Sequence, residues 1–307
     1  MDAEPASGGE VSAARARPTV LYIMGAGRSG STILGVALGN SRNVFFAGEL
    51  DRWFARSGVP RDAARRASFW SSVLEQVGDA EDLFVADTTV LERSSTLLHL
   101  ANWRARRRLR GRYREVSQSL YLAVARASGA THIVDSSHYP LRARELMALP
   151  DIDLHLLFLV RDPHSVVASL GRRDVPERRF AAPAANAYLW LTYAVSVLVF
   201  LRHPRRRRLL VRHEDFLADP EGVLREILTH CEAPADVPDL DCLQVGSPFH
   251  GNRLIKADEV ALRPHRDAPV RRSLLTSVLQ LPWALVLSRL RPAVGSSERR
   301  ERSGAAD

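Results

Sequence analysis

Residues 19–39 read TVLYIMGAGRSGSTILGVALG and place an apolar run, a glycine-rich turn and a second apolar stretch in direct succession. The first run predicts a short strand over residues 19–24, and the last stretch predicts a helix. A strand, a glycine loop and a helix in this order form the opening unit of a nucleotide-binding α/β sheet. The backbone N–H groups of such a loop and the positive end of the helix dipole both favour an anion. We therefore predict that residues 25–32 bind a phosphate group.

Each residue type in this loop suits anion binding for a different reason. Glycine permits the tight turn, and the Arg28 guanidinium supplies a fixed charge in a fork that matches oxyanions. Hydroxyl groups at the helix start can cap the helix or bond a phosphate oxygen. The candidate contacts are Gly27, Arg28, Ser29, Gly30, Ser31 and Thr32. A glycine turn that serves packing alone is the alternative.

The loop must be compared with the two common nucleotide-binding patterns. Gly25 and Gly30 fit the spacing of the Walker A loop, but Ser31 stands where that loop requires lysine. The only lysine of the chain is Lys256, so a standard ATP- or GTP-hydrolysing loop is disfavoured. The Rossmann pattern G-x-G-x-x-G does match, and Glu49 follows Gly30 by 19 residues, near the usual position of the ribose-binding acid. A dinucleotide site therefore stays open.

Apolar runs alternate with helical patterns along the rest of the chain. The predicted strands cover residues 44–46, 131–137, 154–160 and 208–212. A helix is expected after Asp162-Pro163, and a long apolar helix is expected over residues 187–201. Such alternation builds a parallel sheet that is buried on both faces. We predict an α/β fold of the P-loop-like, three-layer kind, with a central parallel sheet flanked by helices.

The composition excludes several classes of protein. The 307 residues are 46% hydrophobic and 25% charged, as in globular proteins. Two cysteines exclude a disulfide scaffold and a cysteine zinc cluster, and no acidic cluster indicates a metal site. Residues 1–17 predict a disordered leader without a secretory signal, so we expect a cytoplasmic protein, and residues 292–307 predict a disordered tail.

Two stretches together resemble the sulfotransferases that use 3′-phosphoadenosine 5′-phosphosulfate (PAPS). The glycine loop is similar to their 5′-phosphosulfate loop, which reads G-x-x-R-S-G-S/T-T. The stretch LFLVRDPHSVVASL, residues 157–170, resembles a segment in which an arginine after a strand and a serine eight residues later hold the 3′-phosphate. The resemblance implies these roles for Arg161 and Ser169. It also implies PAPS as the co-substrate, with no metal ion.

Weaker matches extend the resemblance towards bacterial, carbohydrate and protein-tyrosine sulfotransferases. VDSSHYP resembles a segment that usually reads Asp-Ser-Ser-Lys-x-Pro, and VRHEDFLADP resembles a V-x-Y-E-D-L segment. HGNRLI is similar to a Gly-Asn-x-x-Arg loop that closes over the nucleotide, which implies nucleotide contacts for Asn252 and Arg253. We accordingly expect a single sulfotransferase domain over residues 18–291, with a helical region on the acceptor side over residues 52–130.

Two further residues join Arg28 as candidates for catalysis. In the protein-tyrosine branch a Gly-Glu pair after the second strand supplies the catalytic carboxylate, which implies that Glu49 is the base. Asp51 could replace Glu49, and a surface role for Glu49 is the other alternative. An acid beside an anionic nucleotide is expected to have a raised pKa. His138 stands where the family has lysine; it could donate to the leaving group, act as the base with Glu49 orienting it, or be structural.

The interpretation favoured by the sequence is a sulfotransferase that acts on a hydroxyl of a small-molecule, lipid or carbohydrate acceptor. A P-loop-type phosphotransferase, a catalytically impaired nucleotide-binding protein of the same fold and a Rossmann dehydrogenase stay open. No motif indicates nucleic-acid binding, although the net charge is +8. Residues 187–201 are too short to span a membrane, and residues 274–290 are interrupted by Gln280 and Pro282, so only surface association through this last helix stays open. The oligomeric state is left open.

Overall fold

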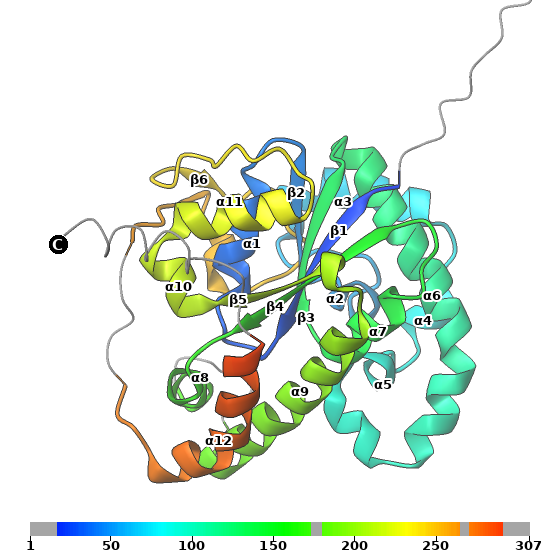
Figure 1. Ribbon diagram of the computed structural model, residues 1–307. Helices are drawn as coiled ribbons and strands as arrows, with labels where there is room; N and C mark the ends of the chain where they lie inside the picture. Colours follow the sequence, from blue (N-terminus) through cyan, green and yellow to red (C-terminus); the bar gives the residue numbers. More distant parts are fainter. Residues whose placement is uncertain (1–16, 173–179, 265–269, 291–307) are drawn as a thin grey trace, which may run out of the picture.

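Five parallel strands form the centre of the protein (Figure 1), whose computed structural model describes residues 17–172, 180–264 and 270–290. Every pair of neighbouring strands is parallel, so their carboxyl ends lie at one edge of the sheet. The order across the sheet is β2 (Val44–Gly48), β3 (His132–His138), β1 (Thr19–Gly25), β4 (Asp153–Val160) and β5 (Arg208–Arg212). The five predicted strands are thereby confirmed. Residues 1–16 of the predicted leader and the whole predicted tail lie outside the described residues.

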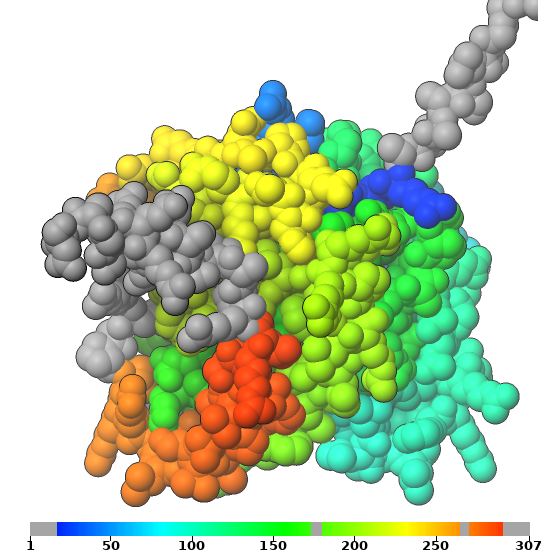
Figure 2. Space-filling view, viewed as in Figure 1, coloured from blue at the N-terminus to red at the C-terminus, as the bar shows by residue number. Residues whose placement is uncertain are grey.

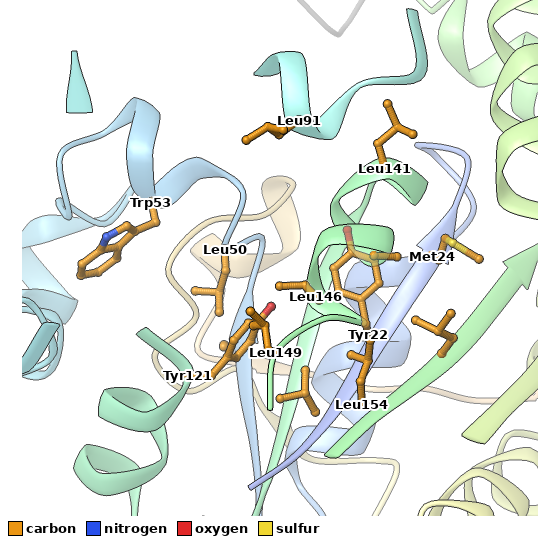
Figure 3. Close-up of a cluster of buried hydrophobic side chains, with 14 of the residues drawn as sticks. Tyr22, Met24, Leu50, Trp53, Leu91, Tyr121, Leu141, Leu146, Leu149 and Leu154 are labelled. Atoms are coloured by element: carbon orange, nitrogen blue, oxygen red, sulfur yellow. The ribbon is translucent and has the colours of Figure 1, made fainter. Parts of the chain in front are cut away.

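The central strands are apolar throughout because both faces of the sheet are covered. In β1, Val20, Tyr22 and Met24 belong to one buried cluster, whereas Leu21 and Ile23 belong to another. Successive side chains of a strand point to opposite faces, so the two clusters lie on opposite sides of the sheet. Figure 3 shows part of the first cluster around Tyr22 and Met24. The predicted α/β fold with a parallel sheet between two helical layers is confirmed.

Helices from separate parts of the chain form the two outer layers. The cluster around Leu21 and Ile23 includes buried residues of α1 (Ser31–Gly39), α10 (His213–Ala218) and α11 (Pro220–His230). The cluster around Tyr22 includes buried residues of α3 (Ala63–Val77), α6 (Ala101–Ser128), α7 (Pro140–Leu146) and α9 (Ala182–Arg202). Helices make up most of residues 52–130, where the sequence predicts a helical region, and the long helix α6 supplies much of the second layer.

A local signal in the sequence accounts for the start of α8, one of several shorter elements. α8 (Pro163–Leu170) starts as predicted, because an Asp162 side-chain oxygen accepts a hydrogen bond from the Ser165 N–H at 2.8 Å. α12 (Leu274–Arg289) lies against α9 and contains Pro282. The other elements are α2 (Arg52–Ala55), α4 (Glu81–Phe84), α5 (Thr89–Glu92), the 3₁₀ turns η1 (Ser94–Leu98), η2 (Arg205–Arg207) and η3 (Arg253–Lys256), and the antiparallel pair β6 (Leu243–Gln244) and β7 (Glu259–Val260).

Helix α9 is longer than its apolar run suggests. It has 21 residues, because Ala182 to Asn186 extend it at the amino end, and Arg202 at the carboxyl end, beyond the expected residues 187–201. By length and composition it could cross a membrane, with a mean hydropathy of 1.6 over its most apolar window. However, 56% of that window is buried inside the protein, and the core helix of a soluble protein passes the same test. Its inner side packs on the sheet, as the buried Leu189 and Tyr193 show.

Candidate active site

The predicted site residues come together at the carboxyl edge of the sheet. The glycine loop follows β1, Glu49 follows β2, His138 ends β3 and Arg161 follows β4. Ligands of open α/β sheets bind at this edge, because the loops after parallel strands meet there. Residues that are far apart in the sequence thus surround one short loop.

Backbone geometry explains why the loop after β1 is rich in glycine. Gly25 has φ of 152°, and a Cβ there would lie 2.3 Å from the carbonyl oxygen of Leu159 on the adjacent strand. Gly30 has φ of 92° and occupies the N-cap position of α1. A glycine cap brings no side chain over the first N–H groups of the helix, which leaves them available to a ligand. Arg28 also has a left-handed backbone, with φ of 70°.

The polar atoms of the loop fit an anionic ligand. Ser29 is almost fully buried, and within the described residues its hydroxyl has no hydrogen-bond partner. A buried hydroxyl without a partner costs free energy unless a ligand or water bonds it. Thr32 is also buried, while Ser31 and Arg28 are half-buried. The loop therefore carries a hydroxyl, a guanidinium and helix N–H groups, which are the donors that bind a phosphate or sulfate ester.

Arg161 is bound directly to the glycine loop. Its Nη1 donates a hydrogen bond to the carbonyl oxygen of Arg28 at 3.0 Å, so the Arg161 guanidinium lies against the backbone of the loop. The backbone at Arg161 is held in turn by the hydroxyl of Tyr193 on α9, which donates to its carbonyl oxygen at 3.2 Å. Ser169 lies further along α8 and is half-buried. Its pairing with Arg161 on a shared 3′-phosphate stays a prediction.

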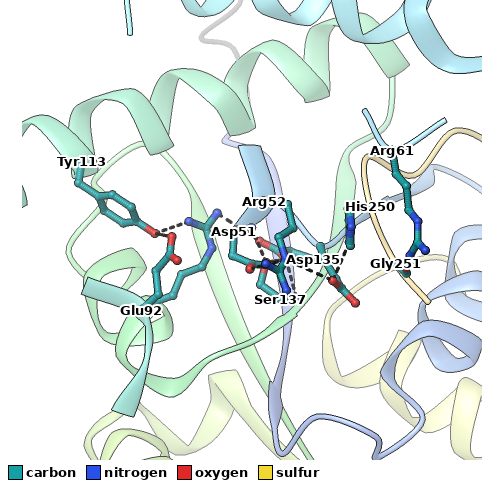
Figure 4. Close-up of polar contacts among 11 residues, drawn as sticks. Asp51, Arg52, Arg61, Glu92, Tyr113, Asp135, Ser137, His250 and Gly251 are labelled. Atoms are coloured by element: carbon teal, nitrogen blue, oxygen red, sulfur yellow. Dashed lines mark hydrogen bonds and ion pairs between the residues drawn. The ribbon is translucent and has the colours of Figure 1, made fainter. Parts of the chain in front are cut away.

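Glu49 is not the surface glutamate that the sequence left open. Its side chain is only 15% exposed, and Oε2 lies 2.9 Å from Nδ1 of His250 and 3.9 Å from Nε of Arg52. The Glu49 N–H donates to the carbonyl oxygen of His250 at 2.9 Å, so both ends of the residue are tied to one partner. Figure 4 shows His250 beside Arg52 and the loop at Gly251.

The pKa of Glu49 differs from the expected raised value. Burial alone would raise this pKa, but the hydrogen bond with His250 and the nearby charge of His138 lower it from the ordinary value. We expected a raised pKa from the charge of a bound anion, whereas the chain itself surrounds the carboxyl group with histidine and arginine. In the protein without a ligand, Glu49 is therefore ionised at neutral pH.

His138 ends β3 and reaches the glycine loop. A Cβ added at Gly27 would lie 3.7 Å from Nε2 of His138 and 3.4 Å from the hydroxyl of Tyr188. The same hydroxyl accepts a hydrogen bond from the Gly27 N–H at 3.1 Å. Burial lowers the pKa of His138, and the charge of Glu49 opposes this shift. The imidazole thus lies beside the loop and interacts with the Glu49 carboxylate, and its pKa is below the ordinary value of a histidine.

A buried polar network fixes the strand end that carries His138. Asp135 and Ser137 are fully buried, and the Asp135 carboxylate accepts from the Ser137 N–H at 2.8 Å. The Ser137 hydroxyl accepts from the Asp51 N–H at 2.9 Å, which connects β3 to the segment after β2. Arg142, also fully buried, pairs with Asp135 at 3.5 Å. These contacts give Asp135 and Ser137 a positioning role.

The loop around η3 lies against the start of α1. A Cβ at Gly251 would lie 3.6 Å from Cγ2 of Thr32, and Nη1 of Arg61 donates to the Gly251 carbonyl oxygen at 2.5 Å. Asn252 uses its side-chain oxygen to cap η3, accepting from the Leu254 N–H at 2.8 Å. Arg253 is exposed. The loop is thus beside the glycine loop, while nucleotide contacts by Asn252 and Arg253 stay predictions.

Three site residues were not singled out from the sequence. His250 holds Glu49, Tyr188 binds the Gly27 N–H, and the His213 ring lies within 2.4 Å of where a Cβ at Gly30 would be. His250 and His213 lie inside segments that carry the resemblance, so a search of those segments for ring nitrogens could have found them. Tyr188 has only a weak signal, a hydroxyl within a long apolar helix.

No group of three histidine, cysteine, aspartate or glutamate residues is placed to hold a metal ion within residues 17–172, 180–264 and 270–290. The arrangement at the edge of the sheet is instead cationic around the loop, with a carboxylate and an imidazole beside it. It can bind an anionic ester and accept a proton from a neighbouring group.

Comparison with solved structures agrees with the fold described above. Two solved structures share the fold: the sulfotransferase domain from the curacin biosynthetic pathway and the sulfotransferase domain from the Synechococcus PCC 7002 olefin synthase. The first has 17% sequence identity and a TM-score of 0.52, with coverage of 88% of this chain and 98% of the other. The second has 19% identity and a TM-score of 0.51, with coverage of 88% and 96%. No curated protein matches.

The sequence itself carries the stronger comparison. A model described as "Sulfotransferase family" matches residues 20–237. This range includes the glycine loop, Glu49, His138 and the Arg161 segment, and it spans more than half of the chain. Because the match covers the sheet and the residues gathered at its edge, the chain belongs to the sulfotransferase family.

Proposed function

We propose that this sulfotransferase transfers a sulfuryl group from PAPS to a hydroxyl of a small-molecule, lipid or carbohydrate acceptor. The observation that carries the proposal is the lysine-free glycine loop, which holds Arg28 and is bonded to Arg161, with His138 and Glu49 beside it. An anionic 5′-ester suits the loop, since its N–H groups and guanidinium groups supply the charge that magnesium supplies in kinases.

PAPS, when bound, would supply an activated sulfur whose bond to the bridging phosphate oxygen breaks as the acceptor oxygen attacks in line. Glu49 is ionised and would take the proton of the acceptor hydroxyl. His250 would hold the carboxylate in place through its 2.9 Å hydrogen bond. Arg28 and the helix N–H groups would stabilise the charge that develops on the leaving phosphate.

His138 would act at the leaving side of the site. The negative charge of a nucleotide would raise its pKa from the lowered value of the free protein, which favours a proton on Nε2. A protonated imidazole could then donate to the bridging oxygen, the role that the family resemblance assigns to lysine. Arg161 would bind the 3′-phosphate and favour PAPS over ATP.

Calorimetric titration without metal tests the donor. We expect adenosine 3′,5′-bisphosphate, the nucleotide product, to bind, and ATP and NAD to bind weakly or not at all. A preference for ATP would overturn the proposal in favour of a phosphotransferase, and a preference for NAD would favour a dehydrogenase. Transfer of ³⁵S from labelled PAPS to a panel of hydroxyl compounds then separates an active enzyme from a protein that only binds the nucleotide.

A further inference from the structure

The inner side of helix α12 carries two polar side chains beside the partly buried Trp283 and Val286, and its outer side carries a row of apolar side chains. Thr276 and Gln280 are almost fully buried against α9. The buried Asn186 of α9 bonds both of them: its Nδ2 donates to the Thr276 hydroxyl at 3.1 Å, and its Oδ1 accepts from Nε2 of Gln280 at 3.1 Å. Surface helices of water-soluble proteins have the opposite arrangement. The hydrogen bonds thus fix α12 with its apolar side outward.

The outward side of α12 is a continuous apolar stripe. Leu274, Val278, Leu281 and Leu285 are 86%, 69%, 56% and 55% exposed. Their spacing of four, three and four residues places them on one face of the helix. Exposed apolar area of this continuity marks a site of interaction with a protein or a membrane.

Helix α9, which packs against α12, also exposes apolar side chains. Its exposed large residues are Trp190, Leu198 and Leu201, which are spaced by eight and three residues and share one face. Trp190 meets the partly buried Trp283 of α12 with ring centroids 5.2 Å apart, so the two helices are in contact at this point. Figure 2 shows orange-red α12 on the surface beside yellow-green α9. We call this surface the α9–α12 face: Trp190, Leu198, Leu201, Leu274, Val278, Leu281 and Leu285.

Arginines border this face, and acidic residues are absent from both helices. Arg271 and Arg272 precede α12, Arg289 lies in its last turn, and all three are exposed. Arg202 ends α9, and the exposed Arg205 follows it. Neither helix contains aspartate or glutamate. An apolar surface with tryptophan and a cationic border matches the boundary between anionic lipid headgroups and acyl chains.

The arginines around the α9–α12 face argue against a second copy of the chain as its binding partner. A symmetric contact through the α9–α12 face would bring the arginines of one copy close to those of the other, and like charges disfavour such a contact. Spanning is also disfavoured, because α9 is packed on the sheet and bound to the glycine loop through Tyr188. We propose that the α9–α12 face docks the protein on an anionic lipid surface, with both helices lying in the plane of the interface.

Flotation of the full chain with lipid vesicles tests the proposal, which does not depend on the identity of the sulfuryl donor. We expect binding to vesicles of equal parts phosphatidylcholine and phosphatidylglycerol, and little binding to phosphatidylcholine alone. The variant Val278→Glu should lose about tenfold or more in binding, because it removes apolar burial and adds a negative charge at the lipid surface. The double variant R271Q/R272Q should lose a similar factor on anionic vesicles.

The matched control is Val85→Glu, a change at another exposed valine, 88% exposed at the end of α4 on another part of the surface (Figure 1). It should bind vesicles as the unchanged protein does. The proposal would be overturned by equal losses of vesicle binding in the two valine variants, or by equal binding to anionic and to neutral vesicles. A dimer in sedimentation velocity that Val278→Glu dissociates would also overturn it, since the face would then join two copies. Leu274→Ser, a milder change, replaces Val278→Glu if circular dichroism shows the latter to be unfolded.

Discussion

Glu49 illustrates at the residue scale how a partner far away in the sequence sets the state of a catalytic candidate. Burial by itself would favour the neutral acid, but His250, His138 and Arg52 surround the carboxyl group and favour the carboxylate. A base that is already ionised needs no activation before it takes a proton. Its strength then depends on how tightly His250 holds it.

Replacing Glu49 tests this role. Glu49→Gln keeps the shape but removes the base, so we expect turnover to fall by about 10²–10⁴-fold while adenosine 3′,5′-bisphosphate still binds. Because the pKa of Glu49 is lowered, the acid limb of the pH–rate profile should lie below the usual range of a glutamate, and the variant should lack that limb. Glu75→Gln on the exposed side of α3 is the control, and it should be unchanged. Full activity in Glu49→Gln would point to Asp51 or His138 as the base.

Arg161→Ala should weaken the binding of adenosine 3′,5′-bisphosphate by ~2–4 kcal/mol, since it leaves a phosphate without its charged partner. Any binding of ATP, which lacks the 3′-phosphate, should change little. Arg42→Ala, at an exposed arginine paired with Asp236, serves as the control in the same titration. An equal loss for both nucleotides would mean that Arg161 supports the loop through Arg28 and does not read the 3′-phosphate.

His138→Lys restores the residue found in the resembling segments. If the histidine donates to the leaving group, lysine should maintain or raise turnover at alkaline pH, where an imidazole has lost its proton. Rates measured across pH, together with nucleotide affinity, distinguish the roles. An inactive variant that binds the nucleotide normally would identify the histidine as a base.

At the scale of the element, the turn between β1 and α1 depends on backbone that only glycine adopts easily. Gly25→Ala should destabilise the protein by ~2–4 kcal/mol, because the new Cβ would lie 2.3 Å from the Leu159 carbonyl oxygen. Gly111→Ala, in the exposed middle of α6 with no atom within 4 Å of the new Cβ, should instead stabilise by up to ~1 kcal/mol. Chemical denaturation measures both, and similar effects at the two positions would contradict this account.

The elements of the sheet were predictable because each strand carries its own signal. The apolar runs at β1 and β4, the glycine loop and the Asp162-Pro163 cap are local patterns, and the structure has each where the sequence places it. The amino end of α9 was missed, since the alanines and Pro183 that extend it carry no apolar periodicity. Contacts between distant segments carry no such pattern.

The candidate site was predictable in part for the same reason. Arg28, Glu49, His138 and Arg161 follow strand ends, so topology alone brings them to one edge. The partners that set their states come from elsewhere: His250 lies 201 residues from Glu49, and Tyr188 lies 161 residues from Gly27. Neither pairing can be recognised from the spacing of residues in the sequence. The lowered pKa of Glu49 could not be predicted without knowing these contacts.

Buried histidines make the stability of the whole molecule sensitive to acid. The pKa of His155 is lowered from 6.5 to about 4, mainly by burial. The nearby charges of His230, Arg207 and His203 contribute to this shift, whereas the charge of Asp153 opposes it. In the unfolded chain this histidine binds a proton more readily than in the folded protein. Its contribution to the free energy of unfolding is therefore fully present above the pKa of the unfolded state and is lost as pH falls towards the pKa of the folded state.

We therefore expect the melting temperature to fall as pH is lowered from neutral towards 4, and to fall less in His155→Asn. His99→Gln, at an exposed histidine, should behave as the unchanged protein does in the same thermal scans. A pH dependence that is identical in all three proteins would exclude His155 as a cause.

Residues 247–256 contact residues 47–49, about 200 positions earlier in the chain, and this has a consequence for synthesis on the ribosome. The Phe249 N–H bonds the Ala47 carbonyl oxygen at 2.8 Å, and His250 closes on Glu49. All five strands of the sheet precede this segment, so an emerging chain can assemble the sheet while its carboxylate still lacks its partner. The edge that carries the candidate site is thus completed late in translation, and a nascent chain released before residue 247 would lack both the buried Phe249 and the His250 partner of Glu49.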